Sequence, residues 1–128
     1  MSRQVIHAEN APKAVGPYSH AIVANGFVYT AGQTGVDPAT GKLVEGGVVA
    51  QTAQAIKNVK AVLEAAGTSL ENVVKTTVYL HAISDFQAMN KAYGEFFATN
   101  PPARTTVGDL DLPLGAQVEI ETVAVLPG

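Results

Sequence analysis

The protein is a chain of 128 residues with 8 basic and 11 acidic side chains, which gives a formal net charge of −3. This length fits a single domain over residues 1–128, and the absence of cysteine excludes disulfides, thiolate chemistry and cysteine-based zinc sites. The lysines are scattered and form no basic stripe, so we expect no nucleic-acid partner. No apolar run has the length of a signal peptide or a membrane span, so we expect a cytoplasmic protein with no membrane partner.

Short strands are predicted in the first third of the chain. Residues 3–7 form the first strand, and residues 21–24 and 27–31 form a hairpin around Asn25-Gly26. This dipeptide favours a tight hairpin because both turn residues must accept positive φ. Residues 32–47 are predicted to be a loop, with a turn at residues 37–41.

Helices and strands alternate in the rest of the chain. One helix is predicted over residues 48–66, ended by Gly67, and a second over residues 86–98, capped by Ser84 or Asp85. Strands are predicted at residues 73–80, 103–107 and 117–126. This order predicts an α+β fold, with two helices packed on one face of a mixed, mostly antiparallel six-stranded sheet.

Some of the predicted strands are apolar on both faces. In the strand over residues 73–80, Val74, Val78 and Leu80 alternate with Val73, Thr77 and Tyr79. Two helices can cover only one face of the sheet, so something else must cover the second. The charged fraction of only 15%, against about 25% in typical globular proteins, also indicates burial beyond one chain. We therefore expect a homo-oligomer.

Arg104 and Glu119 each stand inside a predicted strand near the C-terminus. A guanidinium can bind a substrate carboxylate through two parallel N–H donors, and a partly buried carboxylate can accept a proton from water. Together they suggest hydrolysis of a small acidic substrate. The alternative from the residues alone is a structural ion pair between the two side chains.

Other candidate motifs do not indicate a particular reaction. Tyr18 lies in the rigid turn Gly16-Pro17-Tyr18-Ser19 and can donate a hydrogen bond to a substrate or simply cap the edge of the core. His7, His20 and His81 lack metal-ligand spacing, so no metal site is predicted. Gly41-Lys42 lacks the other residues of a phosphate-binding loop.

Several segments together resemble the Rid family, also called the YjgF family, of reactive intermediate deaminases. The matching segments run over essentially the whole chain in order: residues 10–12, 16–19, 32–33, 58–60, 64–67, 74–78, 85–86, 90–97, 102–104 and 118–121. The resemblance implies a chorismate-mutase-like fold and a homotrimer with a central β-barrel, whose sites lie between subunits. It also implies cofactor-free hydrolysis of 2-enamino and 2-imino acids, such as 2-aminoacrylate, 2-iminopropanoate and 2-iminobutanoate, to 2-keto acids and ammonia.

The resemblance also assigns roles to particular residues. Arg104 holds the substrate carboxylate, and Glu119 orients and activates water. The backbones of Gly32 and Thr106 contact the reacting end of the substrate. Tyr18 reaches in from the neighbouring subunit, and Asn90 shapes the pocket. Arg104 and Glu119 are then expected to face one cleft without forming a closed bidentate bridge.

The chain departs from the family pattern at a few positions. Thr105-Thr106 replaces a common Ser-Cys, Ala31 replaces a serine, and His20 stands where glutamine is usual. Substrate preference is the property that these changes affect. A non-catalytic trimer that binds a small carboxylate or amino acid, and a translation-inhibiting ribonuclease, are the alternative functions.

Overall fold

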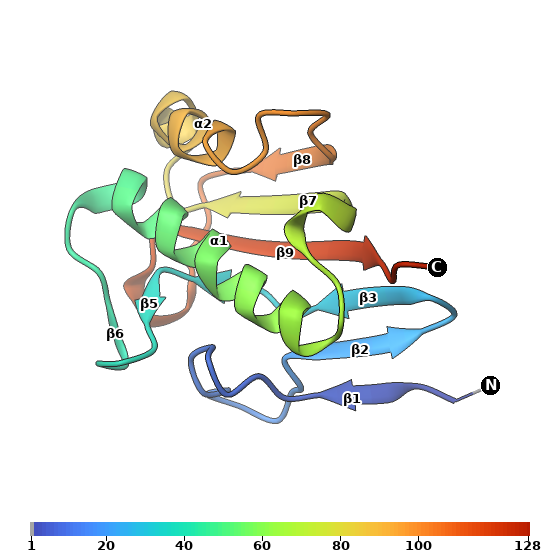
Figure 1. The fold of residues 1–128 in the computed structure, drawn as a ribbon. Coiled ribbons are helices and arrows are strands. Elements are labelled where there is room, and N and C mark those ends of the chain that lie inside the picture. Colours follow the sequence, from blue (N-terminus) through green and yellow to red (C-terminus); the bar gives the residue numbers. More distant parts are fainter. Residues whose placement is uncertain (1) are drawn as a thin grey trace.

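The computed structural model describes residues 2–128 and forms two layers, a β-sheet and two α-helices that cover one of its faces (Figure 1). Six strands follow the order β1-β2-β3-β9-β7-β8, and β4 also pairs with β9, which makes seven strands. The predicted α+β fold is confirmed, with one strand more than expected. The strands of this sheet are β1 (Gln4–Ile6), β2 (Ala21–Ala24), β3 (Phe27–Thr30), β4 (Gln33–Thr34), β7 (Val73–Leu80), β8 (Ala103–Val107) and β9 (Val118–Val125).

The additional strand comes from the region predicted to be a loop. Besides β4, residues 32–47 contain β5 (Val36–Asp37) and β6 (Lys42–Leu43), which pair with each other around the predicted turn at residues 37–41. β4 continues the line of β3 along β9, with Thr34 opposite Glu119. This pairing brings the segment around Gly32 beside the middle of the last strand.

The sheet is mixed because β7 and β8 run parallel, whereas the other neighbouring strands described in it pair antiparallel. A parallel pair needs a crossover connection, and the segment containing α2 (Phe86–Gly94) supplies it. The tight hairpin between β2 and β3 is confirmed, since Asn25 and Gly26 have φ values of 55° and 80°.

The core lies between the sheet and α1 (Gly47–Ala65). This helix buries Ile56, Val59 and Leu63 against sheet residues such as Val78 and Ile120. It ends next to Gly67, whose φ of 90° fits the predicted C-terminal glycine. Within residues 2–128, no helix is both long and apolar enough to cross a membrane.

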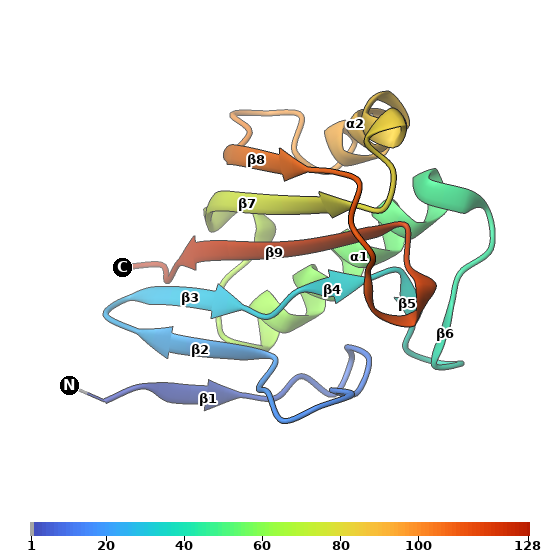
Figure 2. The ribbon, with the colours of Figure 1, turned by 180° about the vertical axis from the view of Figure 1, so that it is seen from behind.

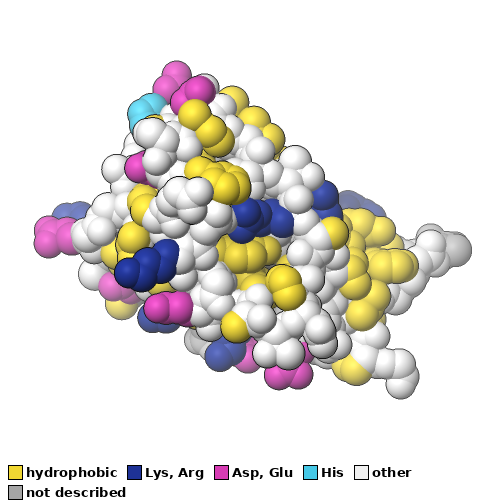
Figure 3. Space-filling model, turned by 90° about the horizontal axis from the view of Figure 1, so that it is seen from above, with side chains coloured by type: hydrophobic (Ala, Val, Ile, Leu, Met, Phe, Trp, Pro, Cys, Tyr) yellow, Lys and Arg dark blue, Asp and Glu magenta, His cyan; other side chains and the backbone are white. Residues whose placement is uncertain are grey.

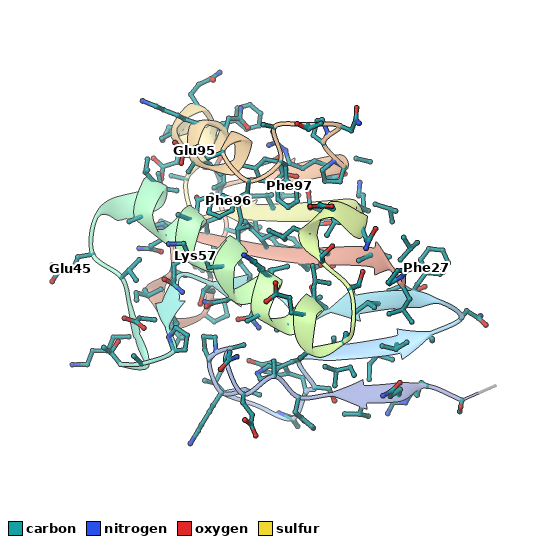
Figure 4. The ribbon with its side chains drawn as sticks, viewed as in Figure 1. Phe27, Glu45, Lys57, Glu95, Phe96 and Phe97 are labelled. Carbon is teal, nitrogen blue, oxygen red and sulfur yellow. The ribbon has the colours of Figure 1, made fainter. Side chains whose placement is uncertain are left out.

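The second helix is shorter than predicted, because α2 ends at Gly94. Asp85 occupies its N-cap position but makes no side-chain capping hydrogen bond. The chain beyond Gly94 stays close to the helix, since the N–H of Phe97 donates to the carbonyl of Tyr93. Phe96 and Phe97 consequently lie between α2 and the sheet (Figure 4).

The sheet face opposite the helices is open in the single chain (Figure 2). Its exposed apolar side chains include Phe27 and Tyr29, which alternate with buried residues in β3, and Val107, which follows half-buried residues in β8. Val74 is also exposed, but a register shift between Val73 and Lys75 places Val73 in the core. The prediction that Val74 shares a face with Val78 is therefore wrong, because a β-bulge shifts the alternation at the start of β7.

Candidate active site

A pocket of about 560 Å³ opens beside the start of β9, and Glu119 is one of the residues that line it. Tyr18 and Gly32 line it as well, so the structure brings together three of the six residues predicted to form the site. We call it the Glu119 pocket. Its other walls come from residues 9–15, 31–41 and 113–114, and are mostly apolar apart from a few residues such as Glu9, Lys13, Gln33 and Thr34.

Gly32 allows the Glu119 carboxylate to lie directly against the backbone. A methyl group on Gly32 would stand 2.8 Å from Cδ and 2.9 Å from Cγ of Glu119, which is closer than real side chains approach. The family resemblance implied a backbone role for Gly32, and the structure gives a physical reason for glycine at this position.

Burial raises the pKa of Glu119 above its ordinary value of 4.5, and the negative charge of Glu121 raises this pKa further. Glu121 lies two residues along on the same face of β9, where it accepts a hydrogen bond of 2.8 Å from the hydroxyl of Tyr79. A carboxylate with a raised pKa is a stronger base once ionised, which suits proton transfer from water.

Arg104 lies at the opposite edge of the sheet, in β8. Its guanidinium carbon is 4.8 Å from the ring centroid of Tyr93 and 5.5 Å from that of Phe86, both on α2. Basic and hydrophobic side chains are seen next to each other on this side of the molecule (Figure 3). Within residues 2–128 the guanidinium makes no hydrogen bond or ion pair with another side chain, so its N–H donors remain free for an anion.

Two further predicted residues lie on this side. Thr106 shares the face of β8 that Arg104 uses, and Asn90 lies between Phe86 and Tyr93 along α2. The side-chain oxygen of Asn90 is buried, and among the described residues it has no hydrogen-bond partner. Such an oxygen is free to accept a hydrogen bond from a ligand. We call Arg104, Phe86, Asn90, Tyr93 and Thr106 the arginine cluster.

The Glu119 pocket and the arginine cluster lie on opposite faces of the sheet. Arg104 is opposite Thr76 of β7, and Thr76 is opposite Thr122 of β9, so all three point toward the helices. Glu119 is an odd number of residues from Thr122 and points to the open face. A single chain therefore does not bring Arg104 and Glu119 to one cleft, and the two form no ion pair. That they face one cleft between subunits stays a prediction.

A comparison with protein families matches residues 8–126 to the family described as Endoribonuclease L-PSP. The chain belongs to this family. Members of the L-PSP family include proteins named Rid, YjgF and RutC, so the family resemblance noted from the sequence is confirmed.

Curated relatives in the L-PSP family match nearly the whole chain. A RutC family protein of Pyrococcus horikoshii is 49% identical and covers 95% of this chain and 97% of its own. The human 2-iminobutanoate/2-iminopropanoate deaminase is 46% identical and covers 96% of this chain and 90% of its own.

Solved structures of the L-PSP family share the fold. The YjgF gene product of E. coli superposes with a TM-score of 0.90 at 40% identity, covering 95% of this chain and 98% of its own. RidA from an Antarctic Psychrobacter bacterium has a TM-score of 0.92 at 43% identity, with 96% and 99% covered.

Several residues in and beside the Glu119 pocket and the arginine cluster were not predicted. Phe86 and Tyr93 were not among the predicted site residues, although their seven-residue spacing around Asn90 places all three on one helical face. Glu121 and Tyr79 were not predicted to meet, because their contact depends on the pairing of β7 with β9. Among the described residues no group of three or more His, Asp or Glu side chains could hold a metal ion.

Proposed function

We propose that the protein is a hydrolytic deaminase, which converts 2-enamino and 2-imino acids to 2-keto acids and ammonia. The substrates are 2-aminoacrylate with its tautomer 2-iminopropanoate, and 2-iminobutanoate. The deaminase relatives at 46% identity support this proposal. The observation that carries it is Arg104, whose guanidinium lies against aromatic rings with its N–H donors free, as a receptor for a small carboxylate requires.

We propose further that the site forms between subunits of a homotrimer. Arg104 and Glu119 cannot reach one substrate within a chain, because the sheet separates them. The exposed apolar side chains of the open face give a second copy a surface to cover, and three sheets packed by these faces would enclose the central β-barrel expected from the family resemblance. The Glu119 pocket of one subunit, with its Tyr18 and Gly32, would then meet the arginine cluster of the next.

The reaction in this cleft follows from the chemistry of the residues. Arg104 binds the substrate carboxylate and thereby places the neighbouring imine carbon. Asn90 can accept a hydrogen bond from the imine N–H, and the backbone of Thr106 contacts the same end. Glu119 takes a proton from water as the water oxygen bonds to the imine carbon, while the imine nitrogen takes a proton from the solvent.

The resulting carbinolamine then breaks down. Glu119 returns its proton to the amine, the carbon–nitrogen bond breaks and ammonia leaves. The hydroxyl group returns one proton to the solvent and becomes the carbonyl of the 2-keto acid. One water is consumed for each ammonia released, and the scheme uses no cofactor. A cytoplasmic location forms part of the same proposal.

The proposal is tested by generating imines enzymatically from several amino acids and following the release of keto acid. We expect wild-type protein to accelerate the release, and Arg104→Ala to lose activity while keeping its assembly state. Lys91→Ala, which removes an exposed cation from α2, is the matched control and should retain activity. Glu119→Gln should still bind a small carboxylate but lose rate.

Two results would redirect the assignment. Binding of a small carboxylate without release of ammonia would favour a non-catalytic binding module. Full activity of Arg104→Ala would remove the proposed carboxylate receptor. Ribonuclease activity, which the family description names, has no supporting observation in this chain, whose net charge is −3.

A further inference from the structure

His20 is a buried side chain that the proposed reaction does not use. It is 5% exposed and lies immediately before β2. Its Nδ1 accepts a hydrogen bond of 2.8 Å from the N–H of Ala8, and its Nε2 lies 2.8 Å from the carbonyl oxygen of Pro12. A backbone N–H can only donate and a carbonyl can only accept, so the two partners select the neutral ring with its proton on Nε2.

The two hydrogen bonds of the imidazole hold residues 8–18 in place, and this segment forms one wall of the Glu119 pocket. This segment follows β1 and has no strand partner. Its own hydrogen bonds are short-range, such as that from the N–H of Val15 to the hydroxyl of Tyr18 at 3.2 Å. Across residues 2–128, no hydrogen bond other than the two to His20 joins this segment to the rest of the chain.

The backbone of His20 is joined to the opposite wall of the pocket. Its carbonyl accepts a hydrogen bond of 2.9 Å from the N–H of Ala31, next to Gly32. Pro12 and Ala31 both line the Glu119 pocket. His20 therefore connects the segment carrying Tyr18 to the segment that adjoins Glu119.

We propose that His20 is a positioning residue of the active site: its neutral imidazole anchors residues 8–18, and with them Tyr18, against the Glu119 pocket. The assignment of a catalytic role to this pocket rests on the proposed function, but the anchor itself is a property of the free protein. No contact between His20 and the substrate is involved.

Glutamine is the substitution that retains the anchor. Its amide carries one acceptor and one donor, as the neutral imidazole does. His20→Gln should keep both bonds, whereas His20→Leu should lose them. His7→Gln is the matched control, because His7 is exposed and makes no hydrogen bond to residues 8–18.

The first measurement is made on the free protein, without substrate. We expect NMR to show the Nε2–H tautomer of His20 and a slowly exchanging Ala8 amide at pH 8. This protection should persist in His7→Gln and in His20→Gln but be lost in His20→Leu. The opposite tautomer, or an Ala8 amide equally protected in His20→Leu, would overturn the proposal.

The second measurement is kcat/KM for imine hydrolysis at pH 8. His20→Leu should lose roughly tenfold to a hundredfold, as misplaced catalytic groups do, while His20→Gln stays close to wild type. An unchanged kcat/KM in His20→Leu, or an equal loss in His20→Gln, would overturn the positioning role. If wild type hydrolyses no imine, the proposed function fails, and the exchange data still decide whether the anchor exists.

Discussion

Arg104 and Glu119 lie on opposite faces of one sheet, with β7 between their strands. Arg104 points toward α2, and Glu119 points to the open face. The proposed pair, divided in this way, could act on one substrate only if two copies of the chain supplied one residue each. The proposed site between subunits would then explain the apolar open face, the unpaired guanidinium and the Glu119 carboxylate in its pocket.

This arrangement predicts complementation between two inactive variants. Arg104→Ala and Glu119→Gln should each be nearly inactive alone. After joint unfolding and refolding in equal amounts, three quarters of randomly assembled trimers contain both variants, and each mixed trimer has one intact cleft. We expect about a quarter of wild-type activity to return, because about a quarter of all clefts combine an unmutated Arg104 from one chain with an unmutated Glu119 from another.

The controls are each variant refolded alone and the two variants mixed without unfolding, neither of which should regain activity. Size-exclusion chromatography with light scattering gives the assembly state of every sample. If the refolded mixture remains inactive although mixed trimers have formed, the two residues do not share a cleft.

Burial and the negative charge of Glu121 raise the pKa of Glu119, the proposed base, which gives a prediction for the pH dependence of the activity. The pKa of Glu119 is raised by burial and by Glu121, and the base works only when ionised. Activity should therefore fall as the pH drops through this raised pKa. Glu121→Gln removes one cause of the increase, so the acid limb of the kcat/KM profile should move to lower pH.

Tyr79→Phe is the matched control for this variant. It removes the hydrogen bond from Tyr79 to Glu121 but leaves the negative charge of Glu121 beside Glu119. Its acid limb should stay close to that of wild type. An acid limb that does not move in Glu121→Gln would show that the charge of Glu121 has no effect on the base.

The order and type of most elements could be predicted from local pattern, because apolar periodicity, Asn25-Gly26 and Gly67 act over short distances along the chain. The short strand β4 could not, since two residues carry no periodicity and form a strand only by pairing with β9. The placement of Arg104 and Glu119 on opposite faces could not be predicted for a related reason. Whether the two residues share a face depends on two strand registers and on the order of β9, β7 and β8.

Tyr93 is expected to hold the guanidinium of Arg104 in place for the substrate. Tyr93→Leu removes the aromatic face 4.8 Å from Arg104, and cation–π contacts of this kind contribute about 0.5–2 kcal/mol. We expect KM to rise up to roughly tenfold, with a smaller effect on kcat, because ground-state binding of the carboxylate is weakened. Steady-state kinetics on 2-iminopropanoate measure both constants.

Two controls separate this effect from a loss of core packing. Phe97→Leu trims the ring that packs on Tyr93 at a centroid distance of 4.7 Å but leaves the ring under Arg104. Tyr93→Phe keeps the ring and loses the 2.8 Å hydrogen bond to Thr76, which should lower stability by about 1 kcal/mol. Both controls should keep a KM near that of wild type. An equal rise of KM in Phe97→Leu would assign the effect to packing alone.

Gly32 is predicted to be intolerant of any side chain because of its contact with Glu119. In Gly32→Ala the new methyl group would overlap the carboxylate, so Glu119 must turn away from the position in which it meets water. Displacement of a catalytic group by about 1 Å can cost roughly a hundredfold in rate, so we expect a large loss of kcat. Gly94→Ala, where no atom lies within 4 Å of the added methyl group, should retain full activity.

A binding measurement separates the loss of rate from a loss of substrate binding. Gly32→Ala should still bind a small carboxylate through Arg104, as measured by calorimetry. A Gly32→Ala protein with wild-type kcat would mean that the position of the Glu119 carboxylate does not limit the reaction.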